Sequence, residues 1–230
     1  LTMFEASDWR YFPKGLKELD LRDELLFEDD ELVWPSTLLK LKMQWNSMLV
    51  AFDTLPRSLT SLTNRSYYEP EFSSEDDDDD DAIPVSPSSD LPAGLTSLSL
   101  PHVSIEDGEW CLNLPAGLTS LEFLLLRVSS LDLLLSIGST CPELMRLTLP
   151  LGQAPTTQEE IPRLLRTLPR HLTACTITVP GQRDSKLQNT HLASLPRGLL
   201  TLTLPHSPHI SSECLSTLPK RLCTLTLGDK

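Results

Sequence analysis

The sequence predicts an α/β fold in which a curved, parallel β-sheet and short connecting helices form one solenoid. The first observation is a verbatim repeat: LPAGLTSL stands at residues 91–98 and again at residues 114–121. The second is that a looser form of this octamer, P-x-x-L-x-x-L-x-L, recurs along nearly the whole chain. A repeat of about 20–50 residues is typical of proteins in which similar units stack into a solenoid.

Nine copies of the pattern are found, and each is led by a proline. The prolines are Pro13, Pro35, Pro56, Pro92, Pro115, Pro142, Pro169, Pro196 and Pro219. Successive prolines are 21–27 residues apart, except for an interval of 36 residues between Pro56 and Pro92. The leucines that follow alternate with polar residues, as expected of a strand with one buried face. One unit cannot bury that face alone, so the strands are expected to lie side by side in parallel.

The longer units also contain helix signals. Units with 27-residue intervals have room for a strand and a helix, whereas those of 21–23 residues have room for a turn or a short helix. The residues TQEE at 157–160 have the spelling of a capping box and lead into IPRLLRTL. The apolar segment LLLSIG at residues 133–138 predicts another helix, with Gly138 as its end.

The chain is expected to be a single solenoid domain spanning residues 1–230. Residues 66–89 account for the one long interval, because this segment is acidic and then rich in proline and serine, a composition that cannot bury a core. We therefore predict an inserted loop there. No polar capping unit is recognisable after the last predicted strand at residues 224–227, so the chain is also expected to be a piece of a longer protein.

The repeat resembles the pattern of leucine-rich-repeat proteins, L-x-x-L-x-L-x-x-N-x-L. The fullest match is made by Leu38, Leu41, Met43, Asn46 and Met48. The segments CPELMRLTL at 141–149 and HISSECLSTL at 209–218 resemble the cysteine-containing subclass found in F-box substrate receptors. The proline-led units are also similar to repeats of protists and bacterial effectors. The resemblance implies a concave sheet face that binds other proteins.

Side chains expected on the concave face are the candidates for partner binding. By the alternation, they are Glu18, Asp20, Arg22, Lys40, Lys42, Gln44, Arg65, Glu122, Arg146, Thr176, Thr203 and Thr226. In parallel register, Glu18 lies beside Lys40 and Asp20 beside Lys42, since both pairs are 22 residues apart. Two interpretations follow: these charges pair across strands, or they remain available to a partner. The threonines likewise suit either an exposed strand or a hydroxyl-lined binding surface.

A run of seven acidic residues stands inside the predicted loop. It consists of Glu75, Asp76, Asp77, Asp78, Asp79, Asp80 and Asp81. The run lacks the central glycine and the closing glutamate of a calcium-binding EF-hand loop, so no metal site is predicted. One interpretation is a solvated loop. The other is docking to a basic partner, or to phosphorylation machinery acting on serines such as Ser73 and Ser74.

Basic residues recur after the leading proline of the last units, as Arg170, Arg197 and Lys220. Their alignment predicts a ridge of positive charge along one edge of the solenoid. The ridge is interpreted either as a feature that promotes solubility or as a site for an acidic ligand. The acidic loop of a second copy is one such ligand, which would give head-to-tail assemblies.

The distribution of charge restricts the classes of partner. Residues 1–110 contain 24 Asp and Glu against 8 Lys and Arg, while residues 111–230 contain 8 against 11. The net charge is −13, so nucleic acid is not an expected ligand. No run of about 18 apolar residues exists, so no membrane span is predicted. Five cysteines without a CxxC pair favour reduced thiols in an intracellular, cytoplasmic protein.

No catalytic signature is found, since G-x-S-x-G, H-E-x-x-H, a P-loop and G-x-G-x-x-G are all absent. We therefore expect a protein that is not an enzyme and uses no cofactor or metal. The sequence predicts a protein–protein interaction module, either a scaffold or a substrate-recognition domain, that binds a protein partner through its concave face and charged edges. Two alternatives are a structural subunit of a large assembly and the recognition part of a ubiquitin-ligase-type protein whose catalytic domain lies elsewhere. The identity of the partner and the oligomeric state stay open.

Overall fold

A computed structural model describes residues 12–21, 34–43, 54–64, 90–105, 113–128, 132–151, 158–178, 187–205 and 209–228. Within them, nine strands form one sheet in chain order, and every neighbouring pair is parallel. The strands are β1 (Glu18–Asp20), β2 (Lys40–Met43), β3 (Ser61–Asn64), β4 (Ser97–Ile105), β5 (Ser120–Val128), β6 (Arg146–Pro150), β7 (Ala174–Thr178), β8 (Thr201–Leu204) and β9 (Thr224–Leu227). The predicted α/β solenoid with a parallel sheet is confirmed.

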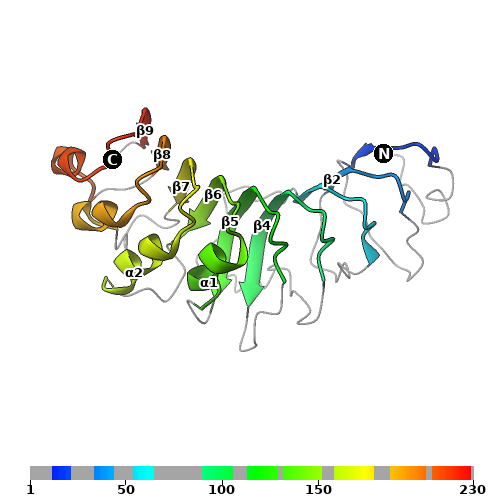
Figure 1. Ribbon diagram of the computed structural model, residues 1–230, viewed down its shortest axis with the longest axis horizontal. Helices are drawn as coiled ribbons and strands as arrows, with labels where there is room; N and C mark the ends of the chain where they lie inside the picture. The colour runs from blue at the N-terminus through cyan, green and yellow to red at the C-terminus, as the bar shows by residue number, and fades with distance from the viewer. Residues whose placement is uncertain are drawn as a thin grey trace, which may run out of the picture.

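The four helices that the structure describes along their full length lie on one side of this sheet, between the later strands. They are α1 (Asp132–Thr140), α2 (Glu160–Thr167) and two 3₁₀-helices, η3 (Asn189–Ser194) and η4 (Ser212–Ser216). Figure 1 shows the sheet curving as an arc from β1 to β9, with α1 and α2 on its outer side. Each helix packs against the next one along the chain, α1 on α2, α2 on η3 and η3 on η4. The inner face of the arc is thus the face that these helices leave uncovered.

A tight turn before each strand explains the P-x-x-L part of the repeat. The carbonyl oxygen of Pro92 accepts a 3.0 Å hydrogen bond from the backbone N–H of Leu95, three residues later. The same bond closes the turns led by Pro13, Pro35, Pro56, Pro115, Pro169, Pro196 and Pro219. In the one shorter unit, Cys141 takes the place of the proline, and Leu144 bonds to its carbonyl oxygen at 3.2 Å. The turn is therefore set by the position three residues before the leucine, whether that residue is a proline or Cys141.

The apolar residues of the repeat stack into rows behind the sheet. In the unit led by Pro115, the inward side chains are Leu114, Leu118, Leu121 and Phe123, and each is at most 6% exposed. Equivalent residues of the other central units belong to the same buried cluster. Burying one leucine contributes roughly 1.5–3 kcal/mol. A unit gains this only when a neighbour covers its apolar face, which is why the units form one continuous core.

Threonine side chains join successive units at the starts of the strands. Each threonine follows the first leucine of its unit, and its hydroxyl donates to the backbone carbonyl of the equivalent residue in the preceding unit. The donor–acceptor pairs are Thr60–Leu39 at 3.0 Å, Thr96–Thr60 at 3.0 Å, Thr119–Thr96 at 3.0 Å and Thr173–Met145 at 3.1 Å. We call these four bonds the threonine ladder. Asn46, the residue at the family's asparagine position, lies outside the described residues.

The prediction that Gly138 ends a helix is wrong, because α1 continues to Thr140. A Cβ atom at Gly138 would overlap the backbone carbonyl oxygen of Thr167 in α2. Glycine is therefore required by the close approach of two helices rather than by a helix end. The TQEE start predicted for α2 lies partly outside the described residues, and α2 begins at its last glutamate, Glu160.

Candidate functional site

The uncovered face of the sheet presents two rows of side chains, all of them polar except Ala174. The first row contains Glu18, Lys40, Ser61, Ser97, Ser120, Arg146, Ala174, Thr201 and Thr224. The second row contains Asp20, Lys42, Thr63, Ser99, Glu122, Thr148, Thr176, Thr203 and Thr226. All eighteen are exposed or half-exposed, while the residues between them point into the core. We call these two rows the polar sheet face.

Charged side chains occupy the β1–β2 end of the polar sheet face. Lys40 Nζ donates to Glu18 Oε1 at 2.7 Å, so one of the two predicted cross-strand pairs forms an ion pair. This hydrogen bond and the positive charge of Lys40 hold the pKa of the Glu18 carboxyl below its ordinary value. Lys42 lies beside Asp20 in register, but forms no ion pair with any described residue. Within the described residues, nothing therefore neutralises the Lys42 ammonium group as Glu18 neutralises Lys40.

Small hydroxyl side chains separate these lysines from a second charged group on β5 and β6. Across β4 and β5, Ser99 Oγ donates to Glu122 Oε2 at 2.8 Å, which orients the carboxylate on the sheet. Arg146 follows on β6, exposed and without an ion pair to the described residues. Three strand spacings separate Lys42 from Glu122, about 14 Å at ~4.8 Å per strand.

The β7–β9 end of the face is neutral and rich in threonine. Thr176, Thr203 and Thr226 lie side by side in register, as the alternation predicts. Thr201 and Thr224 form the same arrangement in the other row. The face therefore changes along the arc from charged side chains to small, uncharged ones.

Some predicted site residues cannot be placed in this arrangement. Arg22, Gln44 and Arg65 lie outside the described residues, and so does the acidic run at residues 75–81. Their roles stay predictions. The other nine candidates are Glu18, Asp20, Lys40, Lys42, Glu122, Arg146, Thr176, Thr203 and Thr226, and the structure brings all of them onto the polar sheet face.

Side chains that could bind a metal ion or act as nucleophiles are spread apart or buried in the described part of the chain. Within the described ranges, no three His, Cys, Asp or Glu side chains lie close enough to hold a metal ion. Burial raises the pKa of the Cys141 thiol to about 11 and that of Cys175 to about 12. At neutral pH both thiols are protonated and therefore weak nucleophiles. In the same described part of the chain, no helix is long and apolar enough to cross a membrane.

One feature of the outer side escaped the sequence analysis. A groove runs between α2 and η3, and Arg166, His191 and Arg197 contribute to its walls. Arg197 was assigned to the basic ridge, but nothing in the sequence connects it with the other two. The sequence offers only the histidine at position 191, and its burial, to 5% exposure, becomes visible in the structure.

Comparison with known proteins finds similarity among solved structures only. No protein-family profile matches the sequence, and no curated protein matches it either. The chain is similar to the leucine-rich repeat-containing protein LegL7 from Legionella pneumophila, with 22% sequence identity and a TM-score of 0.45. The match covers 60% of this chain and 48% of LegL7, so this chain spans about half of that protein's length. The description of the fold as a leucine-rich-repeat solenoid therefore rests on the nine repeats and the parallel sheet of this chain itself.

Proposed function

We propose that the chain is a protein-interaction module that binds a protein partner through the polar sheet face. Support comes from the rigidity of this surface, since every described strand is hydrogen-bonded to its neighbours and the strands from β2 to β8 are backed by buried apolar residues. A surface that is already ordered loses little conformational freedom when it binds, so its contacts contribute more fully to affinity. Reduced thiols make the cytoplasm the compartment in which we expect this partner.

One observation supports the proposal more than any other, namely the order of charges along the face. Lys42 on β2 and Glu122 on β5 are three strand spacings apart, about 14 Å along the sheet, with the next strand adding Arg146. The hydroxyl groups between them are small and let a partner's backbone approach closely. We therefore expect a partner with an acidic group over β2 and side chains of both charges over β5 and β6.

The test is affinity capture from native lysate followed by mass spectrometry and a binding titration with the captured protein. Two variants change opposite ends of the face: Lys40→Glu with Lys42→Glu, and Thr176→Arg with Thr203→Arg and Thr226→Arg. We expect wild type to capture a stoichiometric partner and at least one variant to lose it. Arg163→Glu, on the outer helix α2, is the control and should keep it. A partner that binds all four proteins equally would exclude the polar sheet face.

A second candidate function is that of a structural subunit, favoured by the β9 end of the sheet. Leu215 and Leu227 are 60% and 47% exposed there, and Leu218, Leu222 and Leu225 are only partly buried. Exposed leucines next to the last strand of the described sheet promote association with another surface. If this function is correct, Leu215→Glu with Leu227→Lys should reduce concentration-dependent association in sedimentation velocity. Unchanged association would argue against it.

The recognition part of a ubiquitin ligase is a narrower form of the first proposal. Its support is the resemblance of the units containing Cys141 and Cys214 to the cysteine-containing subclass. Both cysteines are buried, as a small apolar residue of such a repeat should be. Capture of ligase components together with the partner would favour this role, and their absence from a stoichiometric complex would exclude it.

A further inference from the structure

The outer side of the solenoid contains a groove that the proposed function does not use. It lies between α2 and η3 and has a volume of about 550 Å³. Its apolar walls are Pro162, Leu165, Leu168, Leu195 and Pro196. The polar sheet face is on the other side of the sheet, so a ligand in this groove would not touch it.

His191 supplies a hydrogen-bond donor at the groove. Its ring is only 5% exposed, and its Nδ1 accepts a 3.1 Å hydrogen bond from the backbone N–H of Gln188. An accepting Nδ1 is unprotonated, so in the neutral ring Nε2 bears the proton and is a donor. Nε2–H has no hydrogen-bond acceptor among the described residues. Nε2 is not one of the buried atoms that lack a partner among the described residues, so solvent reaches it, and an acceptor on a ligand would take the place of water there.

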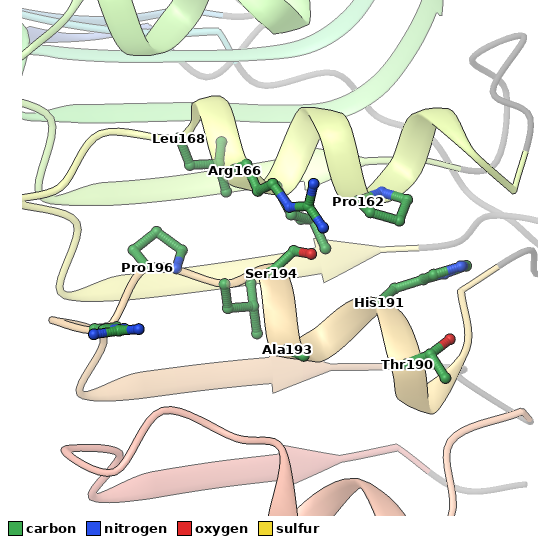
Figure 2. Close-up of a pocket in the computed structure, with 11 residues that line it drawn as sticks. Pro162, Arg166, Leu168, Thr190, His191, Ala193, Ser194 and Pro196 are labelled. Carbon is green, nitrogen blue, oxygen red and sulfur yellow. The ribbon is translucent and has the colours of Figure 1, made fainter.

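Two arginines add positive charge to the same groove. Arg166, from the last turn of α2, and Arg197, from the turn after η3, are both exposed and line the groove. Neither forms an ion pair with any residue that the structure describes. Figure 2 shows the Arg166 guanidinium above the Ser194 hydroxyl, while the His191 ring extends from η3 away from Arg166, on the side of Pro162 and Thr190. Arg166 and His191 thus line the same groove at separate places.

The charge of the surrounding units favours an anionic ligand. The described residues from 158 to 228 include six Lys and Arg but only three Asp and Glu. They include Arg163 and Arg170, which lie near the groove without lining it. The excess of positive charge is opposite in sign to the net charge of −13 for the whole chain.

The size and the walls of the groove indicate the class of ligand. A volume of about 550 Å³ is many times that of one water molecule, ~30 Å³, so the groove is larger than a single carboxylate or phosphate needs. Its prolines and leucines suit the aliphatic parts of a peptide. No aromatic side chain other than His191 lines it, so it offers no platform on which nucleic acid bases could stack.

We propose that this groove binds an acidic peptide segment of a partner protein. Arg166 and Arg197 hold an oxyanion, which is an aspartate or glutamate carboxylate or a phosphoserine phosphate, and His191 Nε2–H donates to another acceptor of the peptide. Guanidinium groups suit both oxyanions because they donate paired, charge-assisted hydrogen bonds. The peptide backbone lies against Pro162 and Pro196. This site is independent of the polar sheet face.

Fluorescence anisotropy of labelled peptides with the full-length chain tests the proposal. The probes are a twelve-residue peptide with four aspartates, the same peptide with two aspartates replaced by phosphoserine, and a version with four lysines. We expect both acidic peptides to bind and the lysine peptide not to bind. The ratio of the two acidic affinities tells whether carboxylate or phosphate is the preferred oxyanion. Failure of both acidic peptides to bind at about 50 mM salt, where electrostatic attraction is strong, overturns the proposal.

A matched pair of variants separates the groove from general surface charge. Arg166→Ala with Arg197→Ala should lower the affinity for the acidic peptides about tenfold or more. Arg163→Ala with Arg170→Ala removes the same charge from positions that do not line the groove and should lower the affinity for these peptides less than about threefold. Equal losses in both variants overturn the proposal, since attraction would then be unspecific. His191→Asn keeps an acceptor for the Gln188 N–H and removes the Nε2–H donor, so the affinity for the acidic peptides is expected to fall a few-fold.

The two proposals can fail separately. The Lys40→Glu, Lys42→Glu variant should bind the acidic peptides with unchanged affinity, because its substitutions lie on β2. If that variant loses peptide binding while the groove variant keeps it, the acidic ligand belongs to the polar sheet face and the groove proposal is wrong. Thermal unfolding of each variant confirms that the exposed arginines were replaced without loss of the fold.

Discussion

The hydroxyl of Thr96 donates a 3.0 Å hydrogen bond to the carbonyl oxygen of Thr60, although 36 residues separate the two threonines. The backbone N–H groups of Thr96 and Ser97 bond to the same carbonyl at 2.8 and 3.1 Å. The other three bonds of the threonine ladder join residues 21, 23 and 28 positions apart. The two units beside the long interval are therefore joined in the same way as the rest of the solenoid.

Replacing Thr96 by valine should lower the free energy of unfolding by about 0.5–1 kcal/mol. Valine keeps the shape of threonine and its preference for strands, but loses the donor. The loss is small because the two backbone N–H groups still satisfy the carbonyl oxygen of Thr60. Urea unfolding followed by circular dichroism measures it. Thr203→Val is the control, since the hydroxyl of Thr203 is not part of the threonine ladder, and equal losses in both variants would contradict the role assigned to the ladder.

Shortening the predicted loop should leave the solenoid intact. Deleting residues 75–87 reduces the interval between Pro56 and Pro92 from 36 to 23 residues, a spacing that other units already have. Ser61 and Ser97 pair across β3 and β4 from outside the deleted segment. We expect the free energy of unfolding to change by no more than about 0.6 kcal/mol, the entropic effect of halving a loop. A loss of several kcal/mol would mean that the segment packs on the core and is not an insertion.

The register of the strands could be read from the sequence because the alternation allows few alternatives. Shifting β2 by one residue would turn Leu41 and Met43 toward water and Lys40 and Lys42 into the core. The spacing of 22 residues therefore fixed which side chains lie beside each other, and Glu18 pairs with Lys40 as predicted. Whether an ion pair also forms depends on flexible side chains in water. Lys42 shows this, because it has the same register and no ion pair with a described residue.

The outer side was much less predictable, since it depends on how helices of unequal units pack. The sequence indicates where a helix begins or ends, but not how closely α1 approaches α2. Gly138 was therefore interpreted as a helix end, whereas its role is to let the two helices touch. The groove beside α2 has the same origin, because it depends on the distance between α2 and η3. Arg166 and His191 line the same groove only because their units stack side by side.

Gly138→Ala tests the contact between the two helices, and two effects predict opposite signs. Alanine is the better helix former, so propensity alone predicts a gain of up to about 1 kcal/mol. Packing predicts a loss, because the new methyl group would overlap the backbone oxygen of Thr167, which cannot move as a side chain can. We expect packing to dominate and the variant to lose about 1–3 kcal/mol or more. Gly117→Ala is the control and should be nearly neutral, since no atom lies within 4 Å of its added Cβ. A stabilised Gly138→Ala variant would refute the contact.

Cysteine reactivity should differ sharply within the described residues. Cys223 is exposed, whereas Cys141, Cys175 and Cys214 are buried. Burial raises the pKa of all three buried thiols, that of Cys175 to about 12, so almost none is thiolate at pH 8. We expect a maleimide to label Cys223 within minutes in the folded protein and the buried three only after denaturation. Peptide mapping assigns each label and treats Cys111, outside the described residues, separately. Labelling of Cys175 at the rate of Cys223 would contradict the stacked core.

His191 should make the solenoid less stable in mild acid. Burial lowers the pKa of its imidazole below the ordinary value of 6.5 that it regains on unfolding. Between these two pKa values the unfolded chain binds a proton that the folded chain does not, so the free energy of unfolding falls as pH drops below about 7 and levels off below the folded pKa. His191→Asn retains an acceptor for the Gln188 N–H but cannot titrate, so its stability should depend less on pH in this window. Urea unfolding from pH 7.5 to 5 measures the difference. Identical slopes for wild type and His191→Asn would show that the imidazole is not buried as the structure describes.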